Sequence, residues 1–180
     1  AEISRINEEI KSSITYSKRI QDALIAHQNL TKDVFAESFV FYKPKDIVGG
    51  DFYFTYKVED NIIFGVADCT GHGVPGAMVS LLCMTFIESA INYFKLLSPR
   101  GILCKVNELL VNSLVSKNHT VRDGMDVSIC TLDSKTSTLY FSGANSKIQF
   151  INSEGSQIIR GNPRPVGHWV DDFVNFDEKI

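Results

Sequence analysis

Two short acidic, glycine-rich segments contain the residues of this sequence that are best suited to chemistry. The first, at residues 46–53, reads DIVGGDFY, and the second, at residues 67–76, reads ADCTGHGVPG. Each places an aspartate beside glycines at the end of an expected strand, so that a carboxylate and unshielded backbone carbonyls meet at one point. Hard divalent cations such as Mg²⁺ and Mn²⁺ prefer oxygen ligands of this kind.

Asp51 and Asp68 are expected to lie close together. Two expected strands, joined by a turn at residues 59–61, run between them. Antiparallel pairing of these strands brings both aspartates to the same end of the hairpin, with residues 52 and 70 roughly opposite each other. Two carboxylates that converge in this way repel each other unless a cation lies between them. The sequence therefore predicts a divalent cation site at this end of the hairpin.

Four neighbouring residues have more than one interpretation. Asp126 is a third candidate carboxylate, although by itself it is more typical of a strand edge or a cap. His72 could protonate a leaving oxygen or orient a water, whereas a hydrogen bond within its turn is the commoner role. Lys45 could contact a substrate phosphate as a point charge, and otherwise it is a solvated strand-edge lysine. Zinc binding through Cys69 and His72 lacks a second ligand pair at suitable spacing.

The elements that must position these residues indicate an α+β fold with antiparallel sheets and two long helices packed on them. A helix expected at 74–94 is apolar almost all round, and the next one begins with Ser98 as its N-cap and Pro99 as its first residue. Asn145–Ser146 and 153–155 have the composition of hairpin turns. The expected strands are 34–43, 51–58, 62–68, 126–132, 137–142, 147–152 and 156–160.

Residues 1–30 are expected to form a linker or regulatory helix ahead of a domain at 31–180. Apolar or small residues recur there at alternating spacings of three and four, which is typical of a heptad seam. The seam consists of Ile3, Ile6, Ile10, Ser13, Ser17, Ile20 and Leu24. Its partner could be a second copy of the chain, giving a homodimer through residues 1–29, or the chain's own domain. A shift of this helix is expected to move a metal ligand and so regulate the site.

Length, charge and composition restrict the class of protein. The chain has 180 residues, enough for one domain with a short appendage, and a net charge of −3. That charge excludes a generic basic nucleic-acid binder. Four widely spaced cysteines without a CxxC pair indicate free thiols in a reducing compartment. No signal-peptide pattern opens the sequence and the run at 74–94 is interrupted by polar residues and a proline, so a cytoplasmic location is expected, with tethering by other regions left open.

The paired segments resemble the metal-dependent, type 2C-like protein serine/threonine phosphatases. The resemblance is closer to their bacterial regulatory branch, the RsbU/SpoIIE group. It covers about residues 34–170 and extends from the two segments through Asp126 and FSGAN at 141–145 to PVG at 165–167. The sequence YSKRIQ at 16–21 resembles the linker that joins such domains to upstream sensor modules. The implied fold is the αββα sandwich of these phosphatases.

The resemblance also implies roles for individual residues. Asp68 would bridge two Mn²⁺ or Mg²⁺ ions, the backbone carbonyl of Cys69 would complete one shell, Asp51 would hold the cluster directly or through water, and Asp126 would ligate the second ion. The implied reaction is hydrolysis of phosphoserine or phosphothreonine by an activated water, without a phosphoenzyme. The implied substrate is a phosphorylated regulatory protein such as an anti-sigma-factor antagonist, under control of an upstream sensor domain.

The sequence departs from the family pattern at its end. The family fold continues with further strands, including a Thr-Asp-Gly segment and a late aspartate of the second metal site, whereas these 180 residues end without them. A missing ligand and incomplete final strands are therefore expected, and the activity of this piece is left open. The alternative function is a non-catalytic signalling or dimerisation module with an incomplete metal site. A third is a mononuclear metal hydrolase of small phosphate esters.

Overall fold

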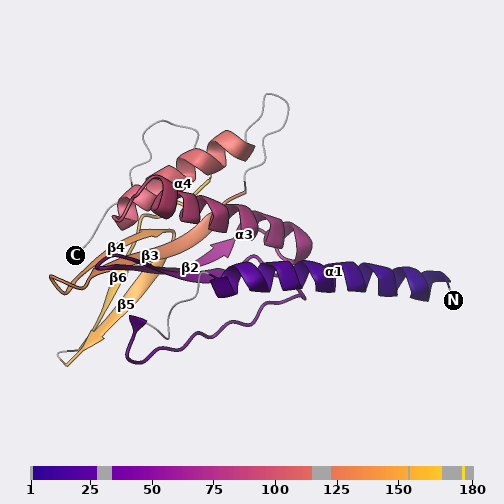
Figure 1. The fold of residues 1–180 in the computed structure, drawn as a ribbon, viewed down its shortest axis with the longest axis horizontal. Helices are drawn as coiled ribbons and strands as arrows, with labels where there is room; N and C mark the ends of the chain where they lie inside the picture. Colours follow the sequence, from indigo (N-terminus) through magenta and orange to yellow (C-terminus); the bar gives the residue numbers. More distant parts are fainter. Residues whose placement is uncertain (1, 28–33, 115–122, 154, 168–175, 177–180) are drawn as a thin grey trace.

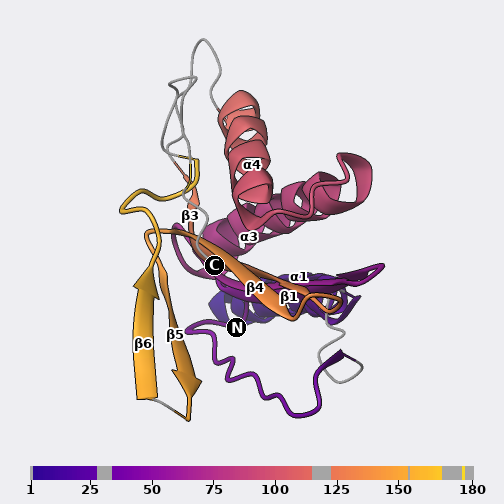
Figure 2. The same cartoon turned by 90° about the vertical axis from the view of Figure 1, so that its left-hand side faces the viewer.

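The main sheet of the protein has four antiparallel strands in the order β1-β2-β3-β4. The computed structural model describes residues 2–27, 34–114, 123–153, 155–167 and 176. A second sheet consists of the hairpin β5-β6, which stands beside the main sheet (Figure 2). The strands are β1 (Phe52–Val58), β2 (Asn61–Cys69), β3 (Met125–Asp133), β4 (Thr138–Ala144), β5 (Lys147–Asn152) and β6 (Gly155–Arg160). The expected α+β architecture with antiparallel sheets is confirmed.

Two long helices cover one face of the main sheet (Figure 1). They are α3 (Gly73–Glu88), which continues into the π-helical turn η1 (Ser89–Tyr93), and α4 (Pro99–Leu114). The predicted cap of α4 is confirmed, because the Gly101 N–H donates to Ser98 Oγ at 3.2 Å. Side chains of both helices and of the covered sheet face form the core, including Met84, Ile87, Ile102, Leu103, Val106, Leu110, Ile63, Val127 and Ile129.

The helical stretch Gly73–Tyr93 is long and apolar enough to cross a membrane, and it is one such stretch among the described residues. Its side chains Cys83, Met84 and Ile87 are nevertheless completely or almost completely buried in the core with residues of α4 and the sheet. A helix that is apolar almost all round is expected in such a position. The stretch is therefore a core helix of this fold.

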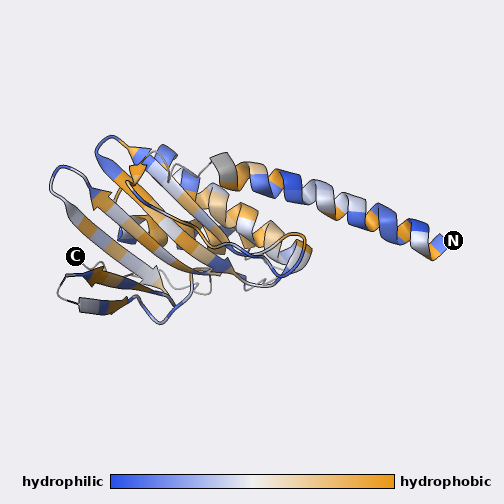
Figure 3. Cartoon of the chain, turned by 90° about the horizontal axis from the view of Figure 1, so that it is seen from below, coloured by the Kyte–Doolittle hydropathy of each residue, from blue (hydrophilic) through white to orange (hydrophobic). Residues whose placement is uncertain are grey.

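The N-terminal helix α1 (Glu2–His27) contacts the rest of the chain near its C-terminal end, where it meets α3 and β1, and its other end projects away (Figure 3). Gln21 and Ile25 are 1% and 5% exposed. Every residue of the predicted seam is exposed, including Ile3 and Ile10. Packing on the chain's own domain is thus confirmed for the C-terminal end of α1, which carries Gln21 and Ile25, while a partner for the seam stays a prediction.

The strand predicted at 34–43 is wrong. The described part of this segment has no ladder partner and runs over the sheet face away from α3 and α4, where Phe35 packs edge-to-face on Phe64 with ring centroids 5.2 Å apart. Phe39 and Phe41 are 91% and 86% exposed. The aromatic composition favours a strand, but strand propensity has no effect without a neighbouring strand that accepts the backbone hydrogen bonds.

The remaining strands are confirmed within two residues, with two corrections to how they connect. In the β1-β2 hairpin, Phe52 faces Ala67 instead of residue 70, because the turn has two residues and Glu59 adopts a left-handed φ of 52°. Asn145–Ser146 is not a hairpin turn. It carries the chain from β4 to β5, which lie in different sheets, and the Asn145 N–H donates to Asn162 O at 2.6 Å.

Candidate metal centre

Three aspartates lie in one row across the neighbouring strands β1, β2 and β3. Asp68 is the register partner of Asp126, and the pairing of Phe52 with Ala67, continued by one residue, places Asp51 opposite Asp68. Cross-strand partners share a sheet face. Because side chains alternate along a strand, the row lies on the face that α3 and α4 leave uncovered. The corrected register therefore aligns the three carboxylates.

The register of β1 with β2 places the Asp51 and Asp68 carboxyl groups next to each other, close enough for Asp51 to affect the pKa of Asp68. Burial raises the pKa of Asp68 above its ordinary value, and the neighbouring Asp51 carboxylate raises it further. Two neighbouring carboxyl groups that repel each other when ionised offer oxygen ligands that a divalent cation fits.

Glycine backbones pack directly against each other behind this carboxyl pair. A Cβ atom on Gly50 would lie 2.9 Å from the Cys69 carbonyl oxygen and 3.0 Å from that of Gly71. A Cβ on Gly76, in the first turns of α3, would lie 2.6 Å from Gly71 O. Only glycine allows approaches this close. The packing fixes the Cys69 carbonyl next to the segment that carries Asp51, where a backbone oxygen ligand is expected.

The Cys69 side chain is directed away from this chemistry. Its thiol is buried, and a hydrogen bond with Cys83 together with burial raises its pKa far above the ordinary range. Zinc ligation requires the thiolate. The neutral thiol of Cys69 therefore packs in the core, and zinc binding through Cys69 and His72 loses support. The group that Cys69 offers to a metal is its backbone carbonyl oxygen.

Asp126 lies beside an open cleft of about 540 Å³. Its carboxylate is held by Asn145, for which the sequence predicted only a place in a turn. Asn145 Nδ2 donates to Asp126 Oδ2 at 2.7 Å. In the described part of the chain, no group of three or more His, Cys, Asp or Glu side chains is arranged to hold a metal ion. The pairing of β3 with β4 is what identifies Asn145 as the neighbour of Asp126. Val127 faces Ala144, so the next pair along the two strands is Asp126 with Asn145.

His72 and Lys45 are both exposed near the two acidic segments. His72 Nδ1 lies 2.9 Å from Asp46 Oδ2, so the imidazole connects the second segment to the first. His72 is also the N-cap residue of α3, but its side chain makes no capping hydrogen bond. It borders the same cleft as Asp68 and Asp126. The substrate-binding roles of His72 and Lys45 stay predictions.

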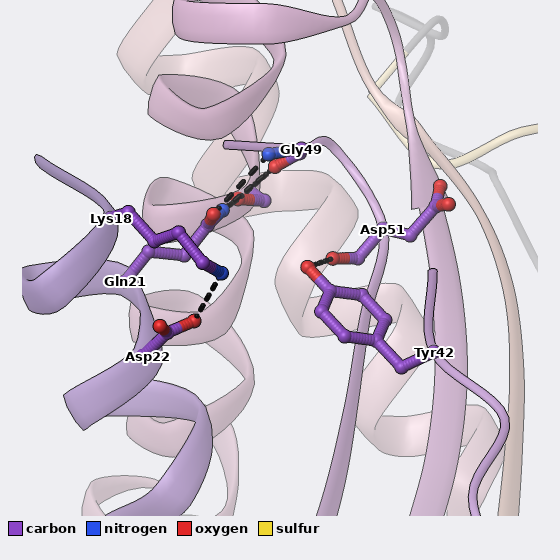
Figure 4. Close-up of polar contacts among 7 residues, drawn as sticks. Lys18, Gln21, Asp22, Tyr42, Gly49 and Asp51 are labelled. Atoms are coloured by element: carbon purple, nitrogen blue, oxygen red, sulfur yellow. Dashed lines mark hydrogen bonds and ion pairs between the residues drawn. The ribbon is translucent and has the colours of Figure 1, made fainter. Parts of the chain in front are cut away.

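Gln21 reaches the back of the site, and the sequence indicated it only as the last residue of the linker-like segment 16–21. The side chain extends from α1 to the backbone of Gly49, two residues before Asp51 (Figure 4). Gln21 lies on the helix face next to the predicted seam and is polar, so periodicity alone placed it on the surface.

A family model described as Stage II sporulation protein E (SpoIIE) matches residues 59–166. This match covers more than half of the chain and includes two of the three aligned aspartates. The chain therefore belongs to the SpoIIE family. A comparison with curated proteins found no match.

Solved structures share the fold of this chain. The SiaA-PP2C domain of Pseudomonas aeruginosa is 29% identical with a TM-score of 0.82, covering 97% of this chain and 67% of that one. SpoIIE of Bacillus subtilis, solved as its PP2C phosphatase domain with a fragment of its regulatory domain, is 15% identical with a TM-score of 0.57, covering 73% and 38%. RsbX in complex with magnesium is 17% identical with a TM-score of 0.57, covering 78% and 64%.

These matches identify the fold as that of PP2C phosphatase domains. The chain spans about two thirds of the length of the SiaA domain and of RsbX, and less of the SpoIIE structure. At 15% and 17% identity, the last two show the fold alone. The predicted family and fold class are confirmed, and the chain is homologous to PP2C-type phosphatase domains.

Proposed function

We propose that this chain is the catalytic domain of a metal-dependent protein serine/threonine phosphatase in a bacterial signalling pathway. The observation that carries the proposal is the alignment of Asp51 with Asp68 on neighbouring strands beside the Cys69 carbonyl. Membership of the SpoIIE family supports it, and so does the complex that RsbX, which shares the fold, forms with magnesium. The substrate would be phosphoserine or phosphothreonine on a regulatory protein, for example an anti-sigma-factor antagonist.

The aligned aspartates fit a centre of two Mn²⁺ or Mg²⁺ ions. Asp51, Asp68, Asp126 and the Cys69 carbonyl would hold them. When bound, the ions would supply an activated water and neutralise charge on the phosphoryl oxygens. Because the pKa of Asp68 is raised, protons compete with the metal for its carboxylate, so metal affinity rises with pH. The Asn145 amide orients Asp126 by its hydrogen bond at 2.7 Å.

The exposed position of the cleft suits a protein substrate. Asp68, His72 and Asp126 all border it, and the first two are exposed, so a phosphorylated loop of a folded partner can reach them. Lys45 would attract the phosphate as a point charge, and His72 would orient a water or protonate the leaving oxygen. A sensor domain ahead of residue 1 would control the reaction, and the domain would work in the cytoplasm, free or tethered by other regions of the protein.

Mn²⁺-dependent turnover of p-nitrophenyl phosphate and of a phosphoserine peptide tests the proposal. We expect turnover by this chain or by a form extended at its C-terminus, and a loss of about 100-fold or more in Asp68→Asn, since even groups that only support metal ligands contribute roughly 10–100-fold. Asp60→Asn is the matched control, because Asp60 lies at the opposite end of the same hairpin and pairs with Lys135. Its activity should equal that of the wild type.

The other outcomes separate the alternatives. Full activity of Asp68→Asn would show that the proposal is wrong. Turnover of p-nitrophenyl phosphate without turnover of any phosphopeptide would favour a hydrolase of small phosphate esters. Mn²⁺ binding that Asp68→Asn abolishes, without turnover in either length of chain, would favour the non-catalytic signalling module.

The exposed seam on α1 supports a homodimer through residues 1–29. Ile3, Ile6 and Ile10 are 77%, 44% and 53% exposed, and they lie in the projecting N-terminal half of α1, several turns before Gln21 and Ile25. A second helix can therefore pack on the seam without displacing α1 from its own domain. Because the seam is short and is interrupted by Ser13 and Ser17, we expect a weak dimer that depends on concentration.

Sedimentation velocity over a concentration series tests the dimer. The double substitution Ile6→Lys with Ile10→Lys should shift the chain to a monomer, because it places charges at the helix interface. Ser12→Lys adds a charge to an exposed residue of α1 outside the seam and should leave association unchanged. A wild-type chain that stays monomeric at every concentration would exclude a dimer through this helix.

A further inference from the structure

A second polar cleft lies beside the cleft of the metal centre, at the base of the β5-β6 hairpin. It holds about 410 Å³, and its lining includes Asn145, Lys147, Arg160 and Asn162. None of the described residues that line it is acidic, although the whole chain has a net charge of −3. We call it the basic cleft. A cleft lined by charges of one sign concentrates ions of the opposite sign, so this one attracts anions.

Lys147 and Arg160 stand directly opposite each other in the basic cleft. They are register partners of β5 and β6, and both residues are exposed. Like charges at directly opposed positions of a strand pair are unfavourable. An anion bound between them would offset this repulsion. The guanidinium group of an arginine also presents a planar set of N–H donors that matches a carboxylate or a phosphate.

The basic cleft shares a wall with the cleft of the metal centre. Asn145 lines both clefts, and its Nδ2 donates to Asp126 Oδ2 at 2.7 Å. The Asn145 N–H donates to Asn162 O at 2.6 Å. Next to it, Gly161 packs so closely on Gly143 that a Cβ atom at position 161 would collide with the Gly143 backbone. Backbone contacts therefore fix the position of the basic cleft relative to Asp126.

The two clefts are close enough to bind one peptide segment. Ser128 Oγ lies 2.8 Å from Ser146 Oγ and donates to Lys147 O at 3.3 Å. Ser128 follows Asp126 by two residues on β3, so the two share a strand face at a spacing of roughly 7 Å. Residues of an extended peptide have the same spacing. A group about two residues from a phosphoserine held beside Asp126 can therefore reach Lys147.

We propose that the basic cleft is a specificity subsite of this domain, in which Lys147 and Arg160 bind a second anionic group of the phosphoprotein substrate, a few residues from the phosphoserine or phosphothreonine. This inference rests on the proposed function. The group would be the carboxylate of an aspartate or glutamate, or a second phosphoryl group, since both form charge-assisted hydrogen bonds with these side chains. The subsite would give the domain a preference among phosphoproteins that binding of one phosphoryl group does not provide.

Steady-state kinetics with Mn²⁺ and a set of phosphoserine peptides test the subsite, with the chain of 180 residues or its C-terminally extended form, whichever is active. The parent peptide has neutral residues around its phosphoserine. Its derivatives carry one aspartate, or a second phosphoserine, at one, two or three residues on either side. At least one derivative should have a KM about 5-fold lower than the parent, because two exposed ion pairs of ordinary strength together give a factor of about this size. An effect of aspartate identifies a carboxylate as the ligand, and an effect of phosphoserine alone identifies a phosphoryl group.

Lys147→Gln with Arg160→Gln should remove this preference. The kcat, the KM of the parent peptide and the turnover of p-nitrophenyl phosphate should stay unchanged, because none of them involves a second anionic group. Lys11→Gln with Lys57→Gln is the matched control. It removes the same charge from exposed lysines of α1 and of the end of β1 remote from Asp51, and it should keep the preference.

A binding experiment in a chelator depends neither on turnover nor on the metal. The unphosphorylated form of the peptide with aspartate, and separately inorganic phosphate, are titrated into ¹⁵N-labelled protein. The backbone amide signals of Ser146 and Gly161, which line the basic cleft, should shift with at least one of these probes. They should not shift in the Lys147→Gln, Arg160→Gln double variant. Thermal unfolding shows whether this variant is folded, and Lys147→Gln alone replaces it if it is not.

The outcomes separate this inference from the proposed function. Equal KM values for the parent and all derivatives would overturn the subsite, while loss of turnover in Asp68→Asn would leave the proposed function standing. A preference that persists in the double variant, or is equally lost in the Lys11→Gln, Lys57→Gln control, would also overturn the subsite. If no peptide were turned over, the proposed function would be wrong, and the titration would decide alone: shifts confined to the basic cleft would support an anion site there, and their absence would exclude it.

Discussion

In the presence of a chelator at neutral pH, Asp68→Asn is expected to unfold at a higher temperature than the wild type, and with saturating Mn²⁺ the order is expected to reverse. Without metal, burial and the neighbouring Asp51 make the ionised Asp68 carboxylate unfavourable. An asparagine keeps the shape of the side chain and removes the charge. With metal, the same charge becomes a ligand, and the variant loses the stabilisation that the bound ion provides.

The pH dependence follows from the direction of the Asp68 shift. The raised pKa means that the folded state binds a proton at pH values where the unfolded carboxyl has already lost it. Metal-free wild type therefore becomes more stable as pH falls from above the raised pKa towards the ordinary carboxyl range. Asp68→Asn lacks this contribution, so the difference between the two proteins should shrink as the pH falls.

Differential scanning fluorimetry with a chelator and with Mn²⁺ at several pH values measures both effects. At a free Mn²⁺ concentration about 100 times its Kd, binding stabilises the wild type by about 2.7 kcal/mol, which for a chain of this length raises Tm by roughly 5–10 °C. Asp60→Asn should show the full Mn²⁺ shift. An Asp68→Asn protein that responds to Mn²⁺ like the wild type would contradict the metal centre.

The meeting of Asp51 with Asp68 was predictable, and the reason is geometric. Both aspartates flank a hairpin whose strands have clear aromatic and β-branched composition, so they meet at one end whatever the detailed pairing. The predicted partner of residue 52 was residue 70 instead of Ala67, and the carboxylates still came together. The family resemblance already implied Asp126 as a ligand, but residue patterns alone could not place it in the same row, because that alignment depends on the pairing of β2 with β3, which are separated by both helices.

The sequence-based predictions that failed concern residues whose role depends on distant parts of the chain. Strand propensity at 34–43 is a local property, whereas a strand requires a neighbour that no local pattern supplies. Gln21 is similar: a glutamine on an amphipathic helix is normally exposed, and its burial depends on hydrogen bonds with the backbone of Gly49, 28 positions later. Patterns within one element predict that element well, and contacts between elements determine how the site is held.

Gly76→Ala is expected to weaken Mn²⁺ binding more than it destabilises the fold. In a helix, alanine is normally more favourable than glycine by about 0.5–1 kcal/mol. At position 76, the new Cβ would lie 2.6 Å from Gly71 O and 2.8 Å from Gly71 C, which are backbone atoms that cannot rotate away. The start of α3 and the turn after Cys69 must therefore separate. Relief of such overpacking typically costs about 1–3 kcal/mol.

That displacement acts directly on the site. Gly71 O also lies against Gly50, so a shift of the turn changes both the Cys69 carbonyl and the Asp51 segment. We expect a Kd for Mn²⁺ at least about 10-fold weaker, measured by calorimetry, together with a modestly lower urea midpoint.

Gly101→Ala in α4 is the matched control, since the nearest atom to its Cβ would be Ser98 Oγ at 3.6 Å, an ordinary contact. It should raise the urea midpoint and leave Mn²⁺ affinity unchanged. If Gly76→Ala behaved in the same way as Gly101→Ala, the close packing of the glycine backbones would have no part in metal binding, and the Cys69 carbonyl would have to be positioned by the hydrogen bonds of β2 alone.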